Sequence, residues 1–322
     1  MKFKQLIIGV IAASISVTTV FAADFPTTIS HNFGETILET EPKRVLSLGL
    51  NDHDFLYALG IAPVGVKEWW GEKEYASWPW ADDERIALGA EPAVHAAGEI
   101  NLEWVAAQNP DLIVAVYSDV DEKLYGLLSE IAPVIAAPKD YPMWGTPWQE
   151  QLRQIAHATE GGAEKAEEII AKLDAQTAKI REQYPQFAGK TASMADFREG
   201  QFTLWAKSHA PTRFVESFGF KFPENLDKLA GEDGWIYISP ENIEQIDLDV
   251  VIWPNGKQDE IEALSLYQNS NLFKQKRSIF LQGSTATLSA ALWFQTPLSL
   301  EFAINGVAPM VAAAVDGDPA TK

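Results

Sequence analysis

A fifteen-residue pattern of polar and apolar positions occurs twice in the chain. Residues 100–114 read INLEWVAAQNPDLIV, and residues 238–252 read ISPENIEQIDLDVVI, without a gap between the copies. Each copy has a small polar residue, a glutamate two positions later, a short helical pattern, an aspartate and an apolar run. Three of the fifteen pairs are identical, so the match depends on ungapped register and shared physics. The repeat predicts two related lobes.

Both copies predict a helix start followed by a buried strand. Asn101 and Ser239 can accept hydrogen bonds from first-turn amides, and Pro240 at the first helical position loses no bond there. The apolar runs after Asp111 and Asp249 do not alternate with polar residues. Such runs are typical of strands buried on both faces of a parallel sheet, so each lobe is expected to be an α/β layer.

The first half of the chain continues this alternation of strands and helices. We expect strands over 44–49, 63–66, 111–117 and 133–136, with helices over 52–59 and 120–131. Thr146, Pro147 and Gln149 predict a capping box that opens the next helix.

The longest helical pattern covers residues 163–184, where apolar residues recur at spacings of three and four. A helix of this length reaches about 33 Å, enough to run along both lobes. In the second half we expect strands over 190–197 and 278–281 and helices over 212–218 and 298–315. The predicted fold class is α/β, with two lobes of mainly parallel sheets flanked by helices and joined by one long backbone helix. The expected division is signal peptide 1–22, N-terminal lobe 23–160, linking helix 161–186 and C-terminal lobe 187–322.

The first 22 residues predict export from the cytoplasm. Lys2 and Lys4 precede an apolar stretch, and small residues before position 23 favour cleavage after Ala22. No later segment is expected to span a bilayer. The chain has no cysteine, which excludes disulfides, thiolate chemistry and a lipid-bearing N-terminal cysteine. The predicted location is the periplasm.

The charge of the chain is strongly acidic. Two of the 25 basic residues and none of the 45 acidic ones fall in the signal segment, so the remainder carries a formal charge of −22. This excludes nucleic acid as a partner and can steer the protein toward a basic partner.

Aromatic residues dominate the loops expected at the carboxyl ends of the strands, where open α/β sheets bind ligands. Each tryptophan could serve core packing, as expected for Trp104 and Trp253, or could pack against a bulky ligand and donate its indole N–H. The candidate ligand-binding residues are Asn51, Trp70, Tyr117, Trp144, Trp205, Arg213, Trp293 and Phe294.

The sequence contains little that indicates catalysis or a bare metal site. The five histidines are scattered without ligand spacing, and paired carboxylates such as Asp82 and Asp83 fit a solvated loop. No glycine-rich phosphate loop, nucleophile elbow or zinc-protease motif occurs where a strand meets a helix. An exported α/β enzyme is the less favoured alternative to a binding protein.

Glu103 and Glu241 occupy equivalent positions in the two copies of the repeat. An acidic residue in a first helical turn complements the helix dipole, worth about 0.3 to 1 kcal/mol. Alternatively, one glutamate per lobe could dock onto arginines of a partner. The residues alone leave both interpretations open.

A series of segments in fixed order resembles the periplasmic ferric-siderophore binding proteins of ABC importers. The resemblance covers essentially the whole chain after the signal segment. It is carried by PKRVLSLG from Pro42, LGIAPVGV from Leu59, the first repeat copy, IAPVIAAP from Ile131, GTPWQEQ from Gly145, the long helix and TLSAALWFQTPLSLEFAI from Thr287.

The resemblance implies an iron(III) chelate held between two lobes by the siderophore's own donors, with no cofactor and no direct protein ligand to the metal. It implies a monomer that delivers this chelate to an inner-membrane ABC permease, with Glu103 and Glu241 at the positions that meet permease arginines.

The similarity is strongest to hydroxamate-type binders, whose WF pair matches Trp293 and Phe294. Some of these carry an arginine where this chain has Ala97-Gly98-Glu99, and Arg213 is the candidate replacement donor. Few basic residues lie in the expected cleft loops, which also favours a neutral or cationic hydroxamate over an anionic catecholate. A haem or cobalamin carrier is the alternative, and haem would need an axial ligand such as Tyr117 or His53.

Overall fold

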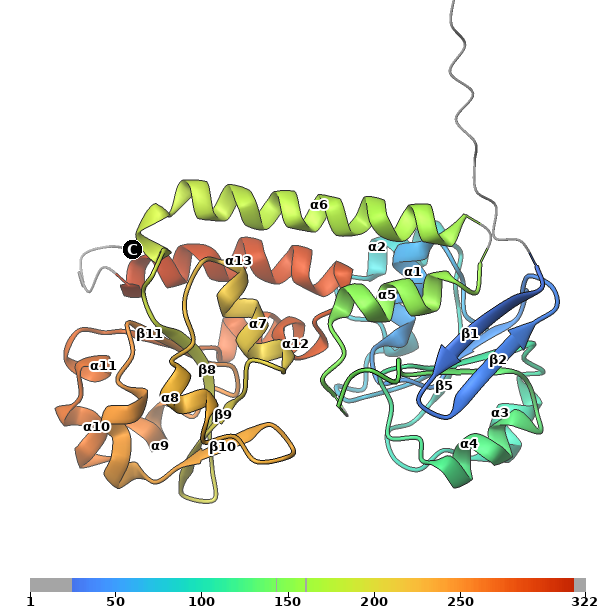
Figure 1. The fold of residues 1–322 in the computed structure, drawn as a ribbon. Helices are drawn as coiled ribbons and strands as arrows, with labels where there is room; N and C mark the ends of the chain where they lie inside the picture. Colours follow the sequence, from blue (N-terminus) through green and yellow to red (C-terminus); the bar gives the residue numbers. More distant parts are fainter. Residues whose placement is uncertain (1–24, 143, 160, 316–322) are drawn as a thin grey trace, which may run out of the picture.

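The computed structural model describes residues 25–142, 144–159 and 161–315. The predicted signal peptide and its cleavage after Ala22 lie outside these residues. Two lobes lie side by side beneath a pair of long helices (Figure 1). This arrangement confirms the predicted two-lobed α/β fold with sheets flanked by helices.

The N-terminal lobe contains a five-stranded sheet in which every pairing is parallel. In four of its five strands every residue is buried. Alternate residues of one strand enter different core clusters, Leu112 and Val114 on one face and Ile113 on the other, as a doubly covered sheet requires. In spatial order the strands are β5 (Ala93–His95), β4 (Gly65–Lys67), β3 (Val45–Ser47), β6 (Leu112–Ala115) and β7 (Val134–Ala136).

The C-terminal lobe contains a mixed sheet, so its prediction as mainly parallel holds only for three strands. β8, β11 and β12 pair in parallel, whereas β9 pairs antiparallel with both β8 and β10. The antiparallel strands were not predicted. In spatial order the strands are β10 (Trp235–Ile238), β9 (Gln201–Trp205), β8 (Ala192–Arg198), β11 (Val250–Trp253) and β12 (Ser278–Phe280).

The shorter elements cover these sheets. An antiparallel hairpin that the sequence pattern did not predict precedes the first sheet and consists of β1 (Thr27–His31) and β2 (Gly34–Leu38). The α-helices of the N-terminal lobe are α1 (Asp52–Leu59), α2 (Asp82–Ala87), α3 (Leu102–Ala107), α4 (Glu122–Ser129) and α5 (Trp148–Ala156). Those of the C-terminal lobe are α7 (Ala210–Ser217), α8 (Glu224–Asp227), α9 (Gln258–Glu262), α10 (Ser265–Asn269), α11 (Asn271–Lys274) and α12 (Ala286–Phe294). The 3₁₀ turns are η1 (Glu74–Ala76), η2 (Pro185–Phe187), η3 (Pro240–Ile246) and η4 (Gly283–Thr285).

Two long helices connect the lobes. α6 (Gly162–Gln183) runs across the top of both lobes, and α13 (Pro297–Val315) packs beneath it, over the C-terminal lobe and against α1 of the N-terminal lobe (Figure 1). One continuous hydrophobic cluster includes Tyr57 of α1, Leu173 of α6, Ile304 of α13 and Phe218 beside α7. The lobes therefore share part of their core through these helices.

α13 corrects the expectation that no later segment could span a bilayer. By length and composition this helix meets the requirement for a membrane span. Ten of its residues are buried, among them Leu300, Val307 and Val311, and they belong to the cluster shared with α6. This packing identifies α13 as a core helix.

The two copies of the repeat differ at their helix starts. The Asn101 side chain accepts a hydrogen bond from the Trp104 amide at 3.0 Å and caps α3, as predicted. The second copy forms the 3₁₀ turn η3, and Ser239 makes no capping hydrogen bond. Asn242 leaves the helical region with φ −105° and ψ 31°, so the expected α-helix does not form. The capping-box prediction also fails at α5, because Pro147 is extended and the helix begins at Trp148 without a side-chain cap.

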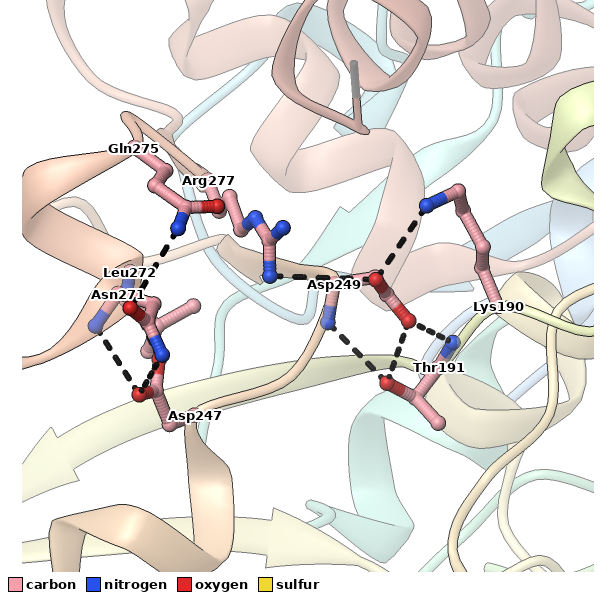
Figure 2. Close-up of polar contacts among 8 residues, drawn as sticks. All are labelled: Lys190, Thr191, Asp247, Asp249, Asn271, Leu272, Gln275 and Arg277. Atoms are coloured by element: carbon pink, nitrogen blue, oxygen red, sulfur yellow. Dashed lines mark hydrogen bonds and ion pairs between the residues drawn. The ribbon is translucent and has the colours of Figure 1, made fainter. Parts of the chain in front are cut away.

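The aspartates of the repeat keep the same role in both lobes. Asp111 accepts hydrogen bonds from the Lys43 and Arg44 amides at 2.8 and 2.7 Å, just before the adjacent strand β3. Asp249 accepts from the Thr191 amide at 2.8 Å, just before the adjacent strand β8 (Figure 2). Each carboxylate thus holds in place the backbone just before a neighbouring parallel strand.

Candidate functional site

A cavity of about 640 Å³ lies between the two lobes. Seven of the eleven tryptophans line it, four from the N-terminal lobe and three from the C-terminal lobe. The remaining lining residues are apolar and polar in equal number. The aromatic and ionisable lining residues are Trp69, Trp70, Trp78, Tyr117, Trp144, Arg198, Trp205, His209, Trp235 and Trp293.

The N-terminal wall is a connected array of rings from loops that follow strands or precede a helix. Trp69 and Trp70 follow β4, Tyr117 follows β6, and Trp144 precedes α5. Ring centroids lie 4.3 Å apart for Trp69 and Trp70, 5.8 Å for Trp69 and Tyr117, and 4.8 Å for Tyr117 and Trp144. The carboxyl ends of parallel strands therefore gather these rings on one side of the cavity, as predicted for an open α/β sheet.

The C-terminal wall is built differently. Trp205 ends β9 and Trp235 begins β10, and the two residues are direct partners in the antiparallel pair. Their rings lie 5.3 Å apart, and Trp293 near the end of α12 lies 5.2 Å from Trp205. Directly paired residues project from the same sheet face, so the unpredicted antiparallel pairing of β9 with β10 places Trp235 beside Trp205.

The arginine on the cavity wall is already paired with an acid. The Arg198 guanidinium forms an ion pair with buried Asp196 and lies 5.5 Å from the Trp235 ring centroid. Asn255 donates to Asp196 at 2.7 Å and accepts from the Trp293 indole at 3.2 Å. This chain of contacts compensates the charge and fixes two of the tryptophans.

Two further titratable groups on the wall are neutral at physiological pH. Burial, together with the nearby Arg213 guanidinium, lowers the pKa of His209. Burial raises the pKa of Tyr117 to about 12, with Arg213 opposing that shift. The cavity therefore presents aromatic faces, hydrogen-bonding groups and a compensated cation.

Five of the eight predicted ligand residues line the cavity, and three lie behind it. The five are Trp70, Tyr117, Trp144, Trp205 and Trp293. Asn51, Arg213 and Phe294 line a second, smaller cavity on the far side of the wall, which Tyr117 and Trp293 share.

The three residues behind the wall engage the protein itself. The Asn51 side-chain amide donates to the Phe294 carbonyl at 2.6 Å. The Phe294 ring is buried and packs between tryptophan rings, with Trp70 at 5.1 Å. Arg213 donates to the Ser208 carbonyl and, at 2.9 Å, to the Gly145 carbonyl of the other lobe. Its guanidinium thus donates hydrogen bonds to backbone carbonyl oxygens of both lobes.

Sequence reasoning missed several lining residues, two of them because they come from segments whose structure it did not predict. Trp78 follows the short turn η1, and Gln295 follows the unpredicted helix α12. His209 precedes α7 and was set aside because no ligand spacing surrounds it. The haem-ligand candidate His53 lines neither cavity, because it is fully buried with Nε2 3.6 Å from the Asp54 carboxylate.

Glu103 and Glu241 are both exposed and lie on different lobes. Glu103 is in α3 and Glu241 is in η3, which packs against α10. Both α3 and α10 lie on the side of the molecule away from α6 (Figure 1). Within the described part of the chain neither carboxylate has a hydrogen bond or ion pair.

Residues 45–284 match the periplasmic binding protein family, and this segment is most of the chain. The chain belongs to that family. A periplasmic binding protein holds a ligand without transforming it, which confirms the prediction of binding in place of catalysis.

Relatives of this periplasmic binding protein carry names that refer to iron chelates. The probable siderophore-binding lipoprotein YfiY of Bacillus subtilis is 28% identical, covering 83% of this chain and 81% of the relative. The ferric enterobactin-binding periplasmic protein FepB of Escherichia coli is 31% identical, covering 69% and 70%. The structure of PiaA from Streptococcus pneumoniae in complex with ferrichrome is 25% identical and covers 90% and 99%, with a TM-score of 0.77.

Among residues 25–142, 144–159 and 161–315, no group of three or more histidine, aspartate or glutamate side chains is arranged to hold a metal ion.

Proposed function

We propose that this protein captures an iron(III)-siderophore chelate between its lobes and delivers it to the permease of an inner-membrane ABC importer. The observation that carries the proposal is the cavity with seven tryptophans drawn from both lobes. Its volume of about 640 Å³ is in the range of small-molecule sites. The names of YfiY and FepB and the ferrichrome complex of PiaA support a chelate as the occupant.

The chelate we propose is of the hydroxamate type. Arg198 is already paired with Asp196, and His209 is neutral, so an anionic complex would find little uncompensated positive charge. Burial of a charge without a partner is strongly unfavourable. A neutral hydroxamate complex can pack on the indole faces and accept hydrogen bonds from indole and phenol groups.

The test is a titration of the purified protein with ferric chelates, followed by tryptophan emission. Ferrichrome, a neutral hydroxamate, should quench the emission with high affinity, and anionic ferric enterobactin should bind much more weakly. Trp293→Phe should reduce the ferrichrome signal and affinity, whereas Trp104→Phe, which lies outside the cavity, should leave the affinity unchanged. Tight binding of ferric enterobactin without ferrichrome binding would overturn the hydroxamate assignment, and failure of ferrichrome, ferric enterobactin, ferric achromobactin and ferric dicitrate alike to bind would overturn the ligand class.

Of the two axial ligands considered for the haem alternative, Tyr117 lines the cavity and His53 does not. The ring of Tyr117 contacts Trp69 and Trp144 within the aromatic wall, as expected of a packing residue. Addition of haemin should therefore produce no Soret band of a tyrosine-ligated haem.

We further propose that Glu103 and Glu241 are the permease-docking residues. Both are exposed, one on each lobe, and free to meet arginines. The acidic character of the chain favours approach to a basic surface. We propose the periplasm as the location, with residues 1–22 as the cleaved signal peptide, in keeping with the periplasmic names of relatives such as FepB.

A further inference from the structure

A second cavity of about 110 Å³ lies behind the chelate cavity, between the lobes and under α6. Four residues line both spaces and form the partition between them: Tyr117, Ala210, Trp293 and Gln295. The cavity also reaches Asp174 and Thr177 of α6. The two cavities therefore share these four residues as a common wall.

Three buried amide side chains contribute unpaired polar atoms to this rear cavity. Asn51, Gln151 and Gln295 are 1%, 4% and 6% exposed, and all three line it. The unpaired atoms are Asn51 Oδ1, Gln151 Oε1 and Gln295 Nε2. A buried polar atom without a partner is unfavourable, so three at one place indicate a bound molecule that satisfies them.

The orientation of two of these amides is fixed by their other half. Asn51 Nδ2 donates to the Phe294 carbonyl at 2.6 Å, and Gln151 Nε2 donates to the Thr146 carbonyl at 2.9 Å. Flipping either amide would place its oxygen against a carbonyl oxygen. Their unpaired atoms are therefore acceptors, and the Gln295 amide adds a third unpaired polar atom, Nε2.

The charges around the cavity select a neutral guest. The Arg213 guanidinium lines the same space, which disfavours a metal cation at the two amide oxygens. Asp174 and those same oxygens disfavour an anion. A guest that both donates and accepts, carries no charge and fits a small polar space is water, which commonly satisfies otherwise unpaired buried groups.

We propose that this rear cavity binds a small cluster of ordered water molecules that joins Asn51, Gln151 and Gln295 and supports the partition behind the bound chelate. Gln151 touches the rear cavity and not the chelate cavity, so it is a positioning residue that acts through the waters. The effect on chelate binding rests on the proposed function, whereas the water site itself does not.

The direct test is a high-resolution crystal structure of the unliganded wild-type protein. We expect ordered waters within hydrogen-bond distance of at least two of the three unpaired amide atoms. A dry cavity in a well-ordered map, or amides rearranged to bond with each other, would overturn the proposal. This outcome is independent of whether any siderophore binds.

The functional test compares two glutamines of α5. Gln151→Leu removes an acceptor from the water site and should raise the dissociation rate of ferrichrome roughly threefold or more. Gln154→Leu is the matched control, because Gln154 is also buried but donates to the Ser30 and Ala136 carbonyls away from either cavity. It should lower the melting temperature and leave the dissociation rate unchanged. Equal effects of the two variants on the rate, or no effect of Gln151→Leu, would refute the positioning role.

Discussion

The two copies of the repeated segment share a sequence pattern but not a backbone conformation. In the N-terminal lobe the segment forms a capped α-helix that leads into an all-parallel sheet. In the C-terminal lobe it forms the 3₁₀ turn η3 and leads into a mixed sheet. The parallel strand, its preceding aspartate and the exposed glutamate are common to both. The conserved aspartates hydrogen-bond to residues before a neighbouring strand, and the glutamates are exposed in both copies. The helical segment that contains the glutamate differs between the copies.

The largest expected effect comes from the glutamates that both copies retain. Changing Glu103 and Glu241 together to alanine should reduce iron-chelate uptake to background while chelate affinity in vitro stays unchanged. Each single variant should lower uptake in part, because each lobe supplies one docking point. Uptake of radiolabelled ferric chelate by cells carrying only the variant protein measures this.

Glu164→Ala is the control for the loss of charge, because Glu164 is exposed on α6, the opposite side of the molecule. Normal uptake by the double variant would exclude these residues as the docking points. Reduced chelate binding by the double variant would place them in the cavity or the fold instead.

The next prediction compares how one acid in each lobe, Asp52 and Asp249, makes the unfolding free energy depend on pH. Burial raises the pKa of Asp52 from 3.8 to about 6, although the Tyr117 and Val116 amides oppose that shift. The folded protein therefore keeps the proton where the unfolded chain releases it, and the stability from this group is lost as pH rises through that window. The unfolding free energy of Asp52→Asn minus that of the wild type should therefore increase by up to about 3 kcal/mol as the pH rises from 3.8 to about 6. Denaturant unfolding at several pH values measures this difference.

Asp249 in the C-terminal lobe should show the opposite sign. Burial alone would raise its pKa, but hydrogen bonds from Thr191 and the Lys190 charge outweigh burial and lower it. Its contribution is present above the ordinary pKa of 3.8 and is lost as pH falls through the lowered value. If Asp52→Asn and Asp249→Asn changed the pH profile in the same direction, the contrast would be wrong.

A smaller difference is expected between the two strand-anchoring aspartates. Asp249→Ala should lower the unfolding free energy by about 2 kcal/mol, because it leaves a partly buried network with Thr191 and Lys190 unpaired (Figure 2). Asp111→Ala should cost about 1 kcal/mol, since its two backbone donors are exposed and can bind water. Urea titrations of both variants provide the comparison, and equal costs would show that burial does not distinguish the anchors.

The smallest effect concerns the helix starts. Asn101→Ala should lower the unfolding free energy by about 1 kcal/mol, because it removes the cap on the Trp104 amide. Ser239→Ala should change it by less than about 0.5 kcal/mol, since Ser239 caps nothing. A larger loss for Ser239→Ala would mean that the serine contributes to the fold in another way.

The parallel core and the linking helix were predictable because each depends on a local pattern. The run at Leu112–Ala115 is uniformly apolar, and α6 carries its apolar residues at helical spacing and ends at proline. The mixed part of the second sheet was not predictable in the same way. β9 and β10 are separated by two helices, so their pairing depends on contacts that no short window contains.

The sequence predicted an aromatic cavity, but it predicted only some of the residues that line it. Trp70, Tyr117 and Trp144 follow from the rule that ligand loops lie at strand ends. Phe294 and Trp293 are neighbours in one helix, and only the packing of α12 decides which ring faces the cavity. Arg213 satisfies backbone carbonyls from both lobes, a role that depends on tertiary structure alone.

The shared cluster along α6 and α13 has a consequence for how the molecule unfolds. α13 packs on α1 of one lobe and on β11 and β12 of the other, so its apolar face is covered only when both lobes are folded. Either lobe expressed alone would expose part of this cluster to water and lose that burial. We therefore expect the bilobal molecule to unfold as a single cooperative unit, so that a destabilising change in one lobe lowers the stability of both.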